Sequence, residues 1–266
     1  MTHEQLRLHI WQQGRKLYRD MPWRRDTRGY YVLVSELMLQ QTQVSRVIPK
    51  FEQFIAAFPD ESTLANAELA DVLKLWQGLG YNRRAKFLLS AARMIATDLS
   101  GRFPDSEPDL LRLPGVGKNT AGAILAYTFN QPSIFIETNI RTVLIHYLFA
   151  DQDEVTDAEL RLALEATLDR EHPREFYWAM MDYGAHLKAQ GIRTNARSKH
   201  YKKQSKLEGS VRQVRGQIVA ALTQHGAQTE EQLREYLRAD ERFEPALRGL
   251  VKDELVVAAS RHITLR

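Results

Sequence analysis

Apolar residues recur at helical spacing through most of this chain of 266 residues. In its middle part they share one helical face at Ala121, Ile124 and Leu125, and the same spacing returns at Ile140, Val143, Leu144, Tyr147 and Leu148. Signals for β-strands are sparse before residue 250. The pattern therefore predicts a mostly α fold. No apolar run approaches the roughly 18 residues of a membrane-spanning helix, so we expect no membrane contact.

The last part of the chain follows a different pattern. Amphipathic segments at 211–224, 229–238 and 243–253 predict three helices, and apolar runs at 255–259 and 263–265 predict a hairpin around a turn at 260–262. Three helices and a hairpin over residues 209–266 are typical of a small winged-helix-like module. Such modules contact DNA in some proteins and other proteins elsewhere, and both alternatives stay open.

Positive charge is concentrated between residues 188 and 217. The whole chain has a net charge of +4, but this stretch has nine basic residues and one acidic residue, which leaves −4 for the remainder. A concentrated stripe is typical of a segment that binds the DNA backbone, and a solvated charged linker is the alternative. We expect residues 188–208 to form a basic linker whose candidate phosphate ligands are Arg197, Lys199, Lys202, Lys203 and Lys206.

A glycine-rich turn within 113–124 carries the first chemical signal. Leu113-Pro114 leads into Gly115-Val116-Gly117, whose glycines allow a tight turn that points backbone N–H groups outward at the start of a helix. Lys118 adds a cation at the same place. The alternative is a glycine that ends one packed helix before the next. The candidate phosphate-binding residues here are Gly115, Val116, Gly117, Lys118 and Thr120.

Two acidic residues lie in contrasting surroundings. Glu36 is an acid inside an otherwise apolar helix, where burial would raise its pKa and let it hold a proton at neutral pH. Glu137 precedes a helix that Thr138 or Asn139 is expected to cap, so the positive helix end should keep Glu137 ionised. A neutral acid and an ionised carboxylate suit the cleavage of an N-glycosidic bond. The plainer alternatives are a solvated Glu36 and an ordinary capping acid at position 137.

These segments, taken in order, resemble the helix-hairpin-helix (HhH-GPD) superfamily of base-excision DNA glycosylases, and within it the MutY-type adenine glycosylases. The likeness covers residues 1–187 and rests on the segments 22–24, 35–44, 76–81, 113–124 and 179–185. It implies a two-lobed fold in which residues 30–135 form a six-helix lobe with the hairpin at 113–124. The N-terminal helix and the last helices of the core would form the other lobe.

The resemblance also implies roles for individual residues. Glu36 matches the general acid that protonates the departing adenine, Glu137 stands where the family has an Asp that stabilises the sugar cation, and Asn139 matches a residue that orients the catalytic groups. The residues implied around the extruded base are Arg19, Trp23, Arg24, Leu39, Gln41, Val44 and Asn119, and those beside the opposite base are Gln40, Gln41 and Tyr81. The implied partner is double-stranded DNA with a mispair or lesion, which a monomer would bind in the cytoplasm.

Four departures from the family pattern bear on this expectation. Glu137 is longer than Asp by one methylene, which moves the carboxylate by about 1.5 Å if nothing compensates. Asn119 stands where strand-cleaving relatives have a Schiff-base Lys, so lyase activity is disfavoured. The chain has no Cys, so the family's iron–sulfur cluster cannot be built, and we expect neither a metal nor another cofactor. The C-terminal module replaces a Nudix-like domain that checks for oxidised guanine.

Three hypotheses for the function follow. The first is a monofunctional glycosylase that removes a mispaired adenine from duplex DNA. The second is a related glycosylase for another base, such as thymine or uracil opposite guanine, and it is supported by Asn119, Glu137 and the missing Nudix-like domain. The third is a DNA-damage-binding protein without catalytic activity. In the first two hypotheses the target base must leave the base stack before it can be excised. This explains why residues that fill the space beside the opposite base, and a basic surface that binds the DNA backbone, would be needed.

Overall fold

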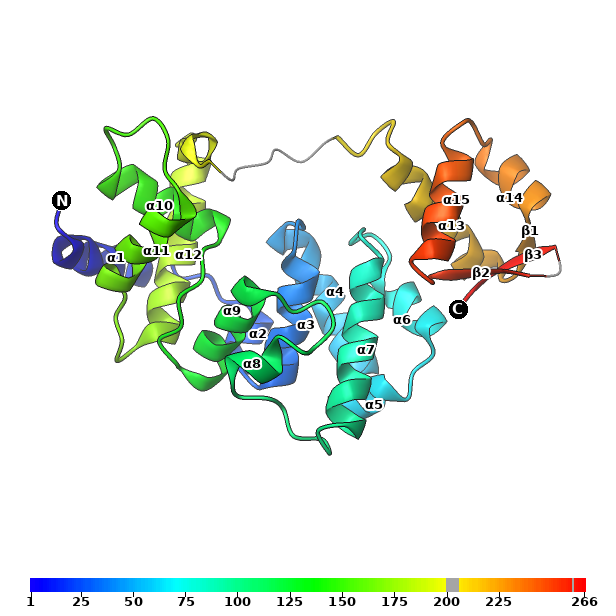
Figure 1. Ribbon diagram of the computed structural model, residues 1–266, viewed down its shortest axis with the longest axis horizontal. Helices are drawn as coiled ribbons and strands as arrows, with labels where there is room; N and C mark the ends of the chain where they lie inside the picture. Colours follow the sequence, from blue (N-terminus) through cyan, green and yellow to red (C-terminus); the bar gives the residue numbers. More distant parts are fainter. Residues whose placement is uncertain (200–205, 260) are drawn as a thin grey trace. The chain divides into compact units, whose positions relative to one another are not determined.

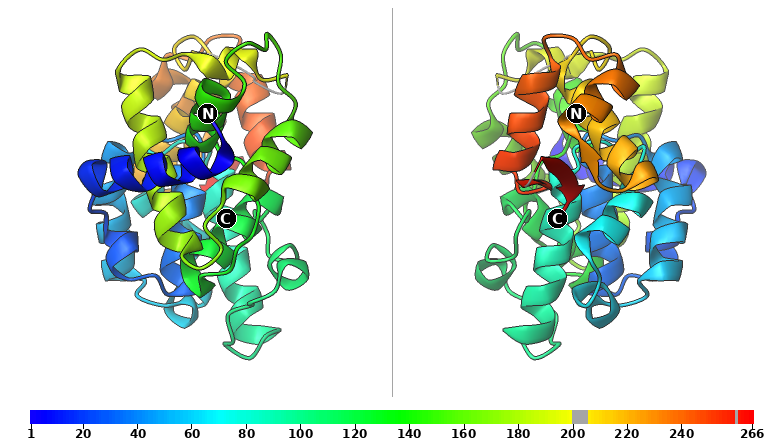
Figure 2. Two further views of the ribbon diagram at one scale, coloured as in Figure 1. Left: turned by 90° about the vertical axis from the view of Figure 1, so that its left-hand side faces the viewer. Right: turned by 90° about the vertical axis from the view of Figure 1, so that its right-hand side faces the viewer.

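The computed structural model describes residues 1–199, 206–259 and 261–266, which divide into two compact units. The first unit comprises residues 1–32, 105–112 and 116–203, and the second comprises residues 33–104, 113–115 and 204–266. Both consist mainly of helices, as the apolar pattern predicts (Figures 1 and 2). Among the described residues, no helix combines the length and apolar character needed to cross a membrane.

The first unit is built around one long helix, α12, which packs against both α1 and α10. Gly14 makes the first of these contacts possible, because a Cβ at this position would overlap the side chain of Ala179. The unit contains α1 (His3–Leu17), α2 (Pro22–Arg25), α8 (Glu107–Leu110), α9 (Lys118–Phe129), α10 (Thr138–Leu148), α11 (Asp157–Thr167), α12 (Pro173–Ala189) and the 3-10 helix η1 (Thr194–Arg197).

In the second unit, aromatic side chains fill the space between short helices. Phe51 and Phe54 of α4 are buried, and the Phe54 ring meets the ring of Trp76 edge-on at a centroid distance of 6.2 Å. Such rings remove a large apolar area from water in little sequence. The helices here are α3 (Gly29–Leu39), which begins in the first unit, α4 (Val44–Ala57), α5 (Glu61–Ala65), α6 (Leu69–Trp76) and α7 (Arg83–Thr97).

The C-terminal part of the second unit has three helices and a small antiparallel sheet of strand order β1-β3-β2 (Figure 2, right). The three predicted helices are present, but the sheet differs from the prediction in two ways. His262, expected in a turn, pairs with both Thr229 and Ala259, and β1 adds a strand that the sequence pattern did not predict. Its elements are α13 (Val211–His225), β1 (Gln228–Thr229), α14 (Glu230–Leu237), α15 (Phe243–Lys252), β2 (Val256–Ala259) and β3 (His262–Leu265).

Candidate active site

Glu137 lies at the N-cap of α10, where extended backbone turns into helix. Its φ and ψ are −108° and 168°, and its carbonyl accepts a hydrogen bond from Arg141 N at 2.8 Å. The prediction that Thr138 or Asn139 caps this helix is wrong, because the extended segment continues as far as residue 137. Within the described chain the Glu137 side chain makes no capping hydrogen bond. The interpretation of Glu137 as an ordinary capping acid is therefore wrong as well.

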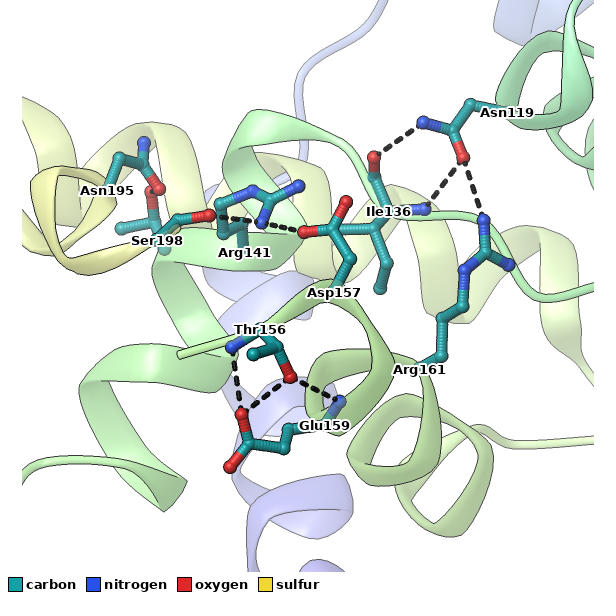
Figure 3. Close-up of polar contacts among 10 residues, drawn as sticks. Asn119, Ile136, Arg141, Thr156, Asp157, Glu159, Arg161, Asn195 and Ser198 are labelled. Carbon is teal, nitrogen blue, oxygen red and sulfur yellow. Dashed lines mark hydrogen bonds and ion pairs between the residues drawn. The ribbon is translucent and has the colours of Figure 1, made fainter. Parts of the chain in front are cut away.

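Asn119, in the first turn of α9, fixes the residue before Glu137. Its side-chain amide donates to the carbonyl of Ile136 at 3.0 Å, and its Oδ1 accepts from the Ile136 N–H at 3.4 Å. Arg161 joins this contact from α11, with a hydrogen bond to Asn119 Oδ1 at 3.5 Å (Figure 3). It also donates to the carbonyl of Ile134 at 3.1 Å. Asn119, which is predicted to line the base pocket, thus fixes the backbone that leads into Glu137.

The surroundings of Glu137 act against the helix end, which is expected to keep this carboxylate ionised. Burial raises the pKa of Glu137, and the positive charge of Lys188 only partly opposes this. Lys188 is itself affected, since burial and the charges of Arg19 and Arg193 lower its pKa, and Glu137 works in the other direction. The loss of water around the carboxylate outweighs the charges that favour its ionised form.

Asn139 supplies a buried polar atom at the start of the same helix. Its side-chain Oδ1 is shielded from solvent and has no hydrogen-bond partner within the described residues. A buried acceptor of this kind is costly and is common at functional sites, where an incoming donor satisfies it. The backbone of Asn139 rests on Gly184 of α12, because a Cβ at Gly184 would overlap its carbonyl group. Only glycine lets the two helices approach this closely.

Asp182 accepts hydrogen bonds from two arginines, Arg19 and Arg24, that were predicted to line the base pocket. Arg24 donates both terminal nitrogens to its carboxylate, at 2.7 and 3.0 Å, and the side chains of Arg24 and Asp182 are only 3% and 1% exposed. Arg19 Nε adds a third contact at 2.6 Å. Trp23, their neighbour in the same segment, is buried. The guanidinium of Arg24 is therefore engaged in joining α2 to α12, and the pocket role of all three residues stays a prediction.

Glu36 lies in the second unit, on α3. It is half-buried, while Ser35 and Leu37 on either side are buried. Its helix ends three residues later at Leu39, which is half-buried, as is Val44 at the start of α4. The exposed Gln41 between them has a left-handed φ of 58°. The predicted roles of these residues around the extruded base stay predictions.

Arg84 is the functional candidate that sequence reasoning missed. It is buried on α7 and donates to the carbonyls of Leu37, Met38 and Gln40 at 2.6, 2.9 and 2.7 Å. Its other terminal nitrogen reaches Thr42 Oγ1, Leu79 O and Gly80 O, and burial lowers its pKa to about 10. Arg84 thus joins the end of the Glu36 helix to the turn before Tyr81. The one signal in the sequence was its helical register with the buried Leu88.

The two glycines of the hairpin serve different purposes. Gly115 has a φ of +81°, and a Cβ there would lie 2.8 Å from Phe87 Cβ, so both backbone and packing require glycine. A Cβ at Gly117 would meet no described atom within 4 Å, which leaves open space before the exposed Lys118. Packing thus explains the first glycine. The space at the second is typical of a turn that a phosphate approaches. Val116 is buried and Thr120 is half-buried. Phosphate binding by this turn stays a prediction.

Part of the basic segment is fastened to the first unit. Arg197 donates to backbone carbonyls of Phe149, Ala150 and Gln152, and Ser198 accepts from Arg141 at 2.6 Å (Figure 3). The exposed Lys199 lies 3.6 Å from Glu154, and Lys206 is exposed. Lys202 and Lys203 lie outside the described residues. Phosphate binding by these five residues stays a prediction.

The residues present do not fit the iron–sulfur cluster of the family that the sequence resembles, since its thiolate ligands are missing from a chain without Cys. In the described part of the chain, no group of three or more His, Asp and Glu side chains is placed to hold a metal ion.

Residues 34–167, half of the chain, match the family model described as "HhH-GPD superfamily base excision DNA repair protein". The adenine DNA glycosylase of Buchnera aphidicola subsp. Baizongia pistaciae is 39% identical over 65% of this chain and 48% of the relative. Those of Homo sapiens and Mycobacterium tuberculosis are 38% and 37% identical, over 63% and 67% of this chain and over 33% and 59% of theirs. The chain thus spans about half the length of the curated relatives it matches.

Two solved structures share the fold. A thermostable thymine-DNA glycosylase matches with a TM-score of 0.59 and 24% identity, over 74% of this chain and 94% of that one. A non-covalent endonuclease III–DNA complex matches with a TM-score of 0.59 and 18% identity, over 71% of this chain and 89% of that one.

Proposed function

Because the chain belongs to the HhH-GPD superfamily of base excision DNA repair proteins, we propose that it is a monofunctional DNA glycosylase that removes a mispaired adenine from duplex DNA. The observation that carries the proposal is the placement of Glu137. Glu137 is half-buried at a helix N-terminus, and its carboxylate makes no capping hydrogen bond to the described chain. Two residues further on, the buried Oδ1 of Asn139 has no hydrogen-bond partner among the described residues. The relatives at 37–39% identity that are named adenine DNA glycosylases support adenine as the base.

The proposed reaction divides the work between two carboxyl groups. Glu36 donates a proton to a ring nitrogen of the adenine, so that the electron pair of the breaking C1′–N9 bond leaves with a neutral base. Glu137, once ionised, stabilises the positive charge that develops on the sugar. Water then adds to C1′ and loses a proton, which leaves an abasic site. Because the pKa of Glu137 is raised, the rate of excision should fall at a higher pH on acidification than it would with a solvated carboxylate.

A duplex panel tests the proposal. Duplexes that differ only in one mispair or lesion are incubated with excess enzyme, and abasic sites are counted over time. We expect excision of adenine, and loss of excision in Glu36→Gln and Glu137→Gln with DNA affinity retained. The matched control is Glu165→Gln, an exposed acid paired with Arg170. Near-normal rates in either site variant would remove that residue from the mechanism.

Asn119 supports the monofunctional character, because an amide forms no imine with the sugar. Borohydride added during turnover should therefore trap no protein–DNA adduct. Efficient trapping would contradict this and point to an amine such as Lys118, which is exposed next to Asn119.

A second candidate substrate is thymine or uracil opposite guanine. It is favoured by Glu137, whose extra methylene suits a different distance to the sugar. The same duplex panel decides between the two, because it includes these mispairs. Binding of a lesion without release of any base would instead indicate a damage-binding protein.

We further propose that the lysines of the basic linker, residues 188–208, set the affinity for DNA and not the choice of base, since phosphate contacts carry no direct sequence information. Replacement of Lys199, Lys202 and Lys203 by Ala should weaken binding to all duplexes alike. The slope of log K against log salt should also flatten by about 0.9 for each lost phosphate contact. A changed preference among mispairs with an unchanged slope would refute this role.

A further inference from the structure

A cavity of about 1060 Å³ lies in the second unit, between the residues predicted to lie beside the opposite base and helix α13 of the C-terminal part. On one side are residues 40–43, which follow the Glu36 helix, and residues 77–84, which include Tyr81. On the other side is α13, with Arg212, Gln213 and Gln217 among the lining residues. Amide and guanidinium groups therefore dominate the polar part of the wall.

Tyr81 is held by arginines from two different elements. Arg84 of α7 lies 5.5 Å from the centre of the Tyr81 ring, and Arg212 of α13 lies 4.9 Å from it. Arg212 also donates a hydrogen bond to the Tyr81 hydroxyl. The backbone of Tyr81 has a left-handed φ of 49°, a conformation that costs a non-glycine residue energy unless its neighbours hold it.

Further contacts fix α13 and its neighbours against α7. Lys86 of α7 donates to the carbonyl of Asp253 at 3.1 Å and pairs with Glu254. Arg215, one turn along α13 from Arg212, pairs with the Asp253 carboxylate at 2.5 Å. The contact between Arg212 and Tyr81 thus accompanies the contacts of Lys86 on α7 with Asp253 and Glu254 of the C-terminal part.

We propose that α13 forms part of the surface that reads the base opposite the excised one, with Arg212 as a positioning residue that acts through Tyr81. The proposal rests on the proposed function. Its ligand is a purine of the opposite strand, because guanidinium and amide donors match the N7 and O6 acceptors of guanine and the O6 and O8 acceptors of 8-oxoguanine. The C-terminal module would then take part in the choice of mispair and not only in affinity for DNA.

The test measures preference for the opposite base in the full-length protein. Duplexes carry adenine opposite guanine, 8-oxoguanine, cytosine or thymine, and both competitive binding and single-turnover excision are recorded. We expect Arg212→Ala to reduce the preference for the purine partners by on the order of tenfold, with Arg212→Lys in between. The matched control is Arg248→Ala, an arginine of the same module that is 70% exposed. It should leave the preference unchanged.

Tyr81→Phe, alone and combined with Arg212→Ala, tests the route of the effect. If Arg212 acts through the Tyr81 hydroxyl, the double variant should lose less preference than the sum of the two single losses. Unfolding of each variant by urea is followed in parallel. An equal loss of preference and of folded protein would show that Arg212 matters only for the fold and would overturn the inference.

The inference and the proposed function fail in different ways. If the wild type excises adenine and Arg212→Ala keeps its opposite-base preference, the inference is wrong and the proposed function stands. If no adenine is released but binding prefers one opposite base and Arg212→Ala removes that preference, the proposed function fails alone. A wild type that binds all four duplexes equally would overturn the inference.

Discussion

The two candidate carboxylates are held in opposite ways in the two units. Glu137 stands at the N-terminus of α10, and the neighbouring Asn139 rests on a glycine of α12. Glu36 stands near the C-terminus of α3, where the carbonyl oxygens of the last turn are gathered by the single cation of Arg84. The region around Glu137 depends on close backbone packing. The region around Glu36 depends on the side chain of Arg84, which donates to six oxygen atoms of the described residues.

The difference follows from the polarity of a helix. A helix N-terminus carries partial positive charge that favours a carboxylate, whereas a C-terminus presents unpaired carbonyls that a cation stabilises. The charge of Arg24 in the first unit is balanced by a buried acid, Asp182, while the hydrogen bonds of Arg84 go to backbone carbonyls and a threonine hydroxyl. Substitutions in the two regions should therefore differ in size.

The largest effect is expected at Asp182. Asp182→Asn leaves the buried Arg24 without its counter-charge, and we expect the free energy of unfolding to fall by about 3–5 kcal/mol. Urea denaturation of the purified variant measures it. The control is Asp71→Asn, which breaks an exposed pair with Lys74 and should cost less than about 1 kcal/mol. Equal losses in the two variants would mean that the buried pair contributes nothing special.

The second effect, at Arg84, tests the other region. Arg84→Lys keeps a positive charge but loses the planar fork that reaches both groups of oxygens, so unfolding should become easier by about 2–3 kcal/mol. Arg93→Lys is a matched control on the same helix, since Arg93 is exposed and, within the described residues, donates to the carbonyls of Ala65 and Ala67. If both lysine variants unfold at the same urea concentration, charge alone holds the end of α3.

Gly184 gives a third, smaller effect in the first unit. Gly184→Ala forces α12 away from the Asn139 carbonyl, and overpacking of this kind costs about 2 kcal/mol. Gly216→Ala is the control for stability, because a Cβ there meets no described atom within 4 Å and helical alanine is favoured over glycine. It should raise the free energy of unfolding. A Gly184→Ala variant as stable as the wild type would show that the helices separate without cost.

The smallest effect is expected at Glu137, and it has the opposite sign. Burial raises the pKa of Glu137 above its ordinary value of 4.5, so the folded state holds the proton more tightly than the unfolded state. The wild type therefore loses stability as pH rises from 4.5 through the raised pKa of the folded protein. Glu137→Gln should be more stable near pH 7 by about 1 kcal/mol, with the gain vanishing in acid, while excision is lost. Urea titrations at several pH values, with Glu165→Gln beside them, measure this; a gain independent of pH would contradict it.

The local pattern of the sequence was enough to predict the mostly α fold class and several of the helices. The three C-terminal helices and the turn at 113–117 lie where apolar spacing and glycine placed them. These features depend on residues a few positions apart, which is the range that such patterns report. The strand β1 was not predicted, because its two residues gain their partners only from β3.

The parts of the candidate site that could not be predicted depend on distant partners. Asn119 and Ile136 are 17 positions apart, and Arg84 reaches carbonyls 44 to 47 positions away. In the sequence an arginine such as Arg84 or Arg197 looks like any surface cation, because backbone carbonyls leave no mark in composition. The cap at Glu137 was missed because capping preference favours Thr and Asn, and the hold on Ile136 prevailed over that preference.

The fastening of residues 194–199 has a consequence for how the protein is made. Arg197 binds the carbonyls of the loop after α10, Ser198 binds Arg141, and the backbone of Ser198 pairs with Val155. Every one of these partners is encoded in the gene. The attachment of residues 194–199 is therefore complete once the chain has been translated and has folded, and it needs neither iron nor a pathway that assembles iron–sulfur clusters.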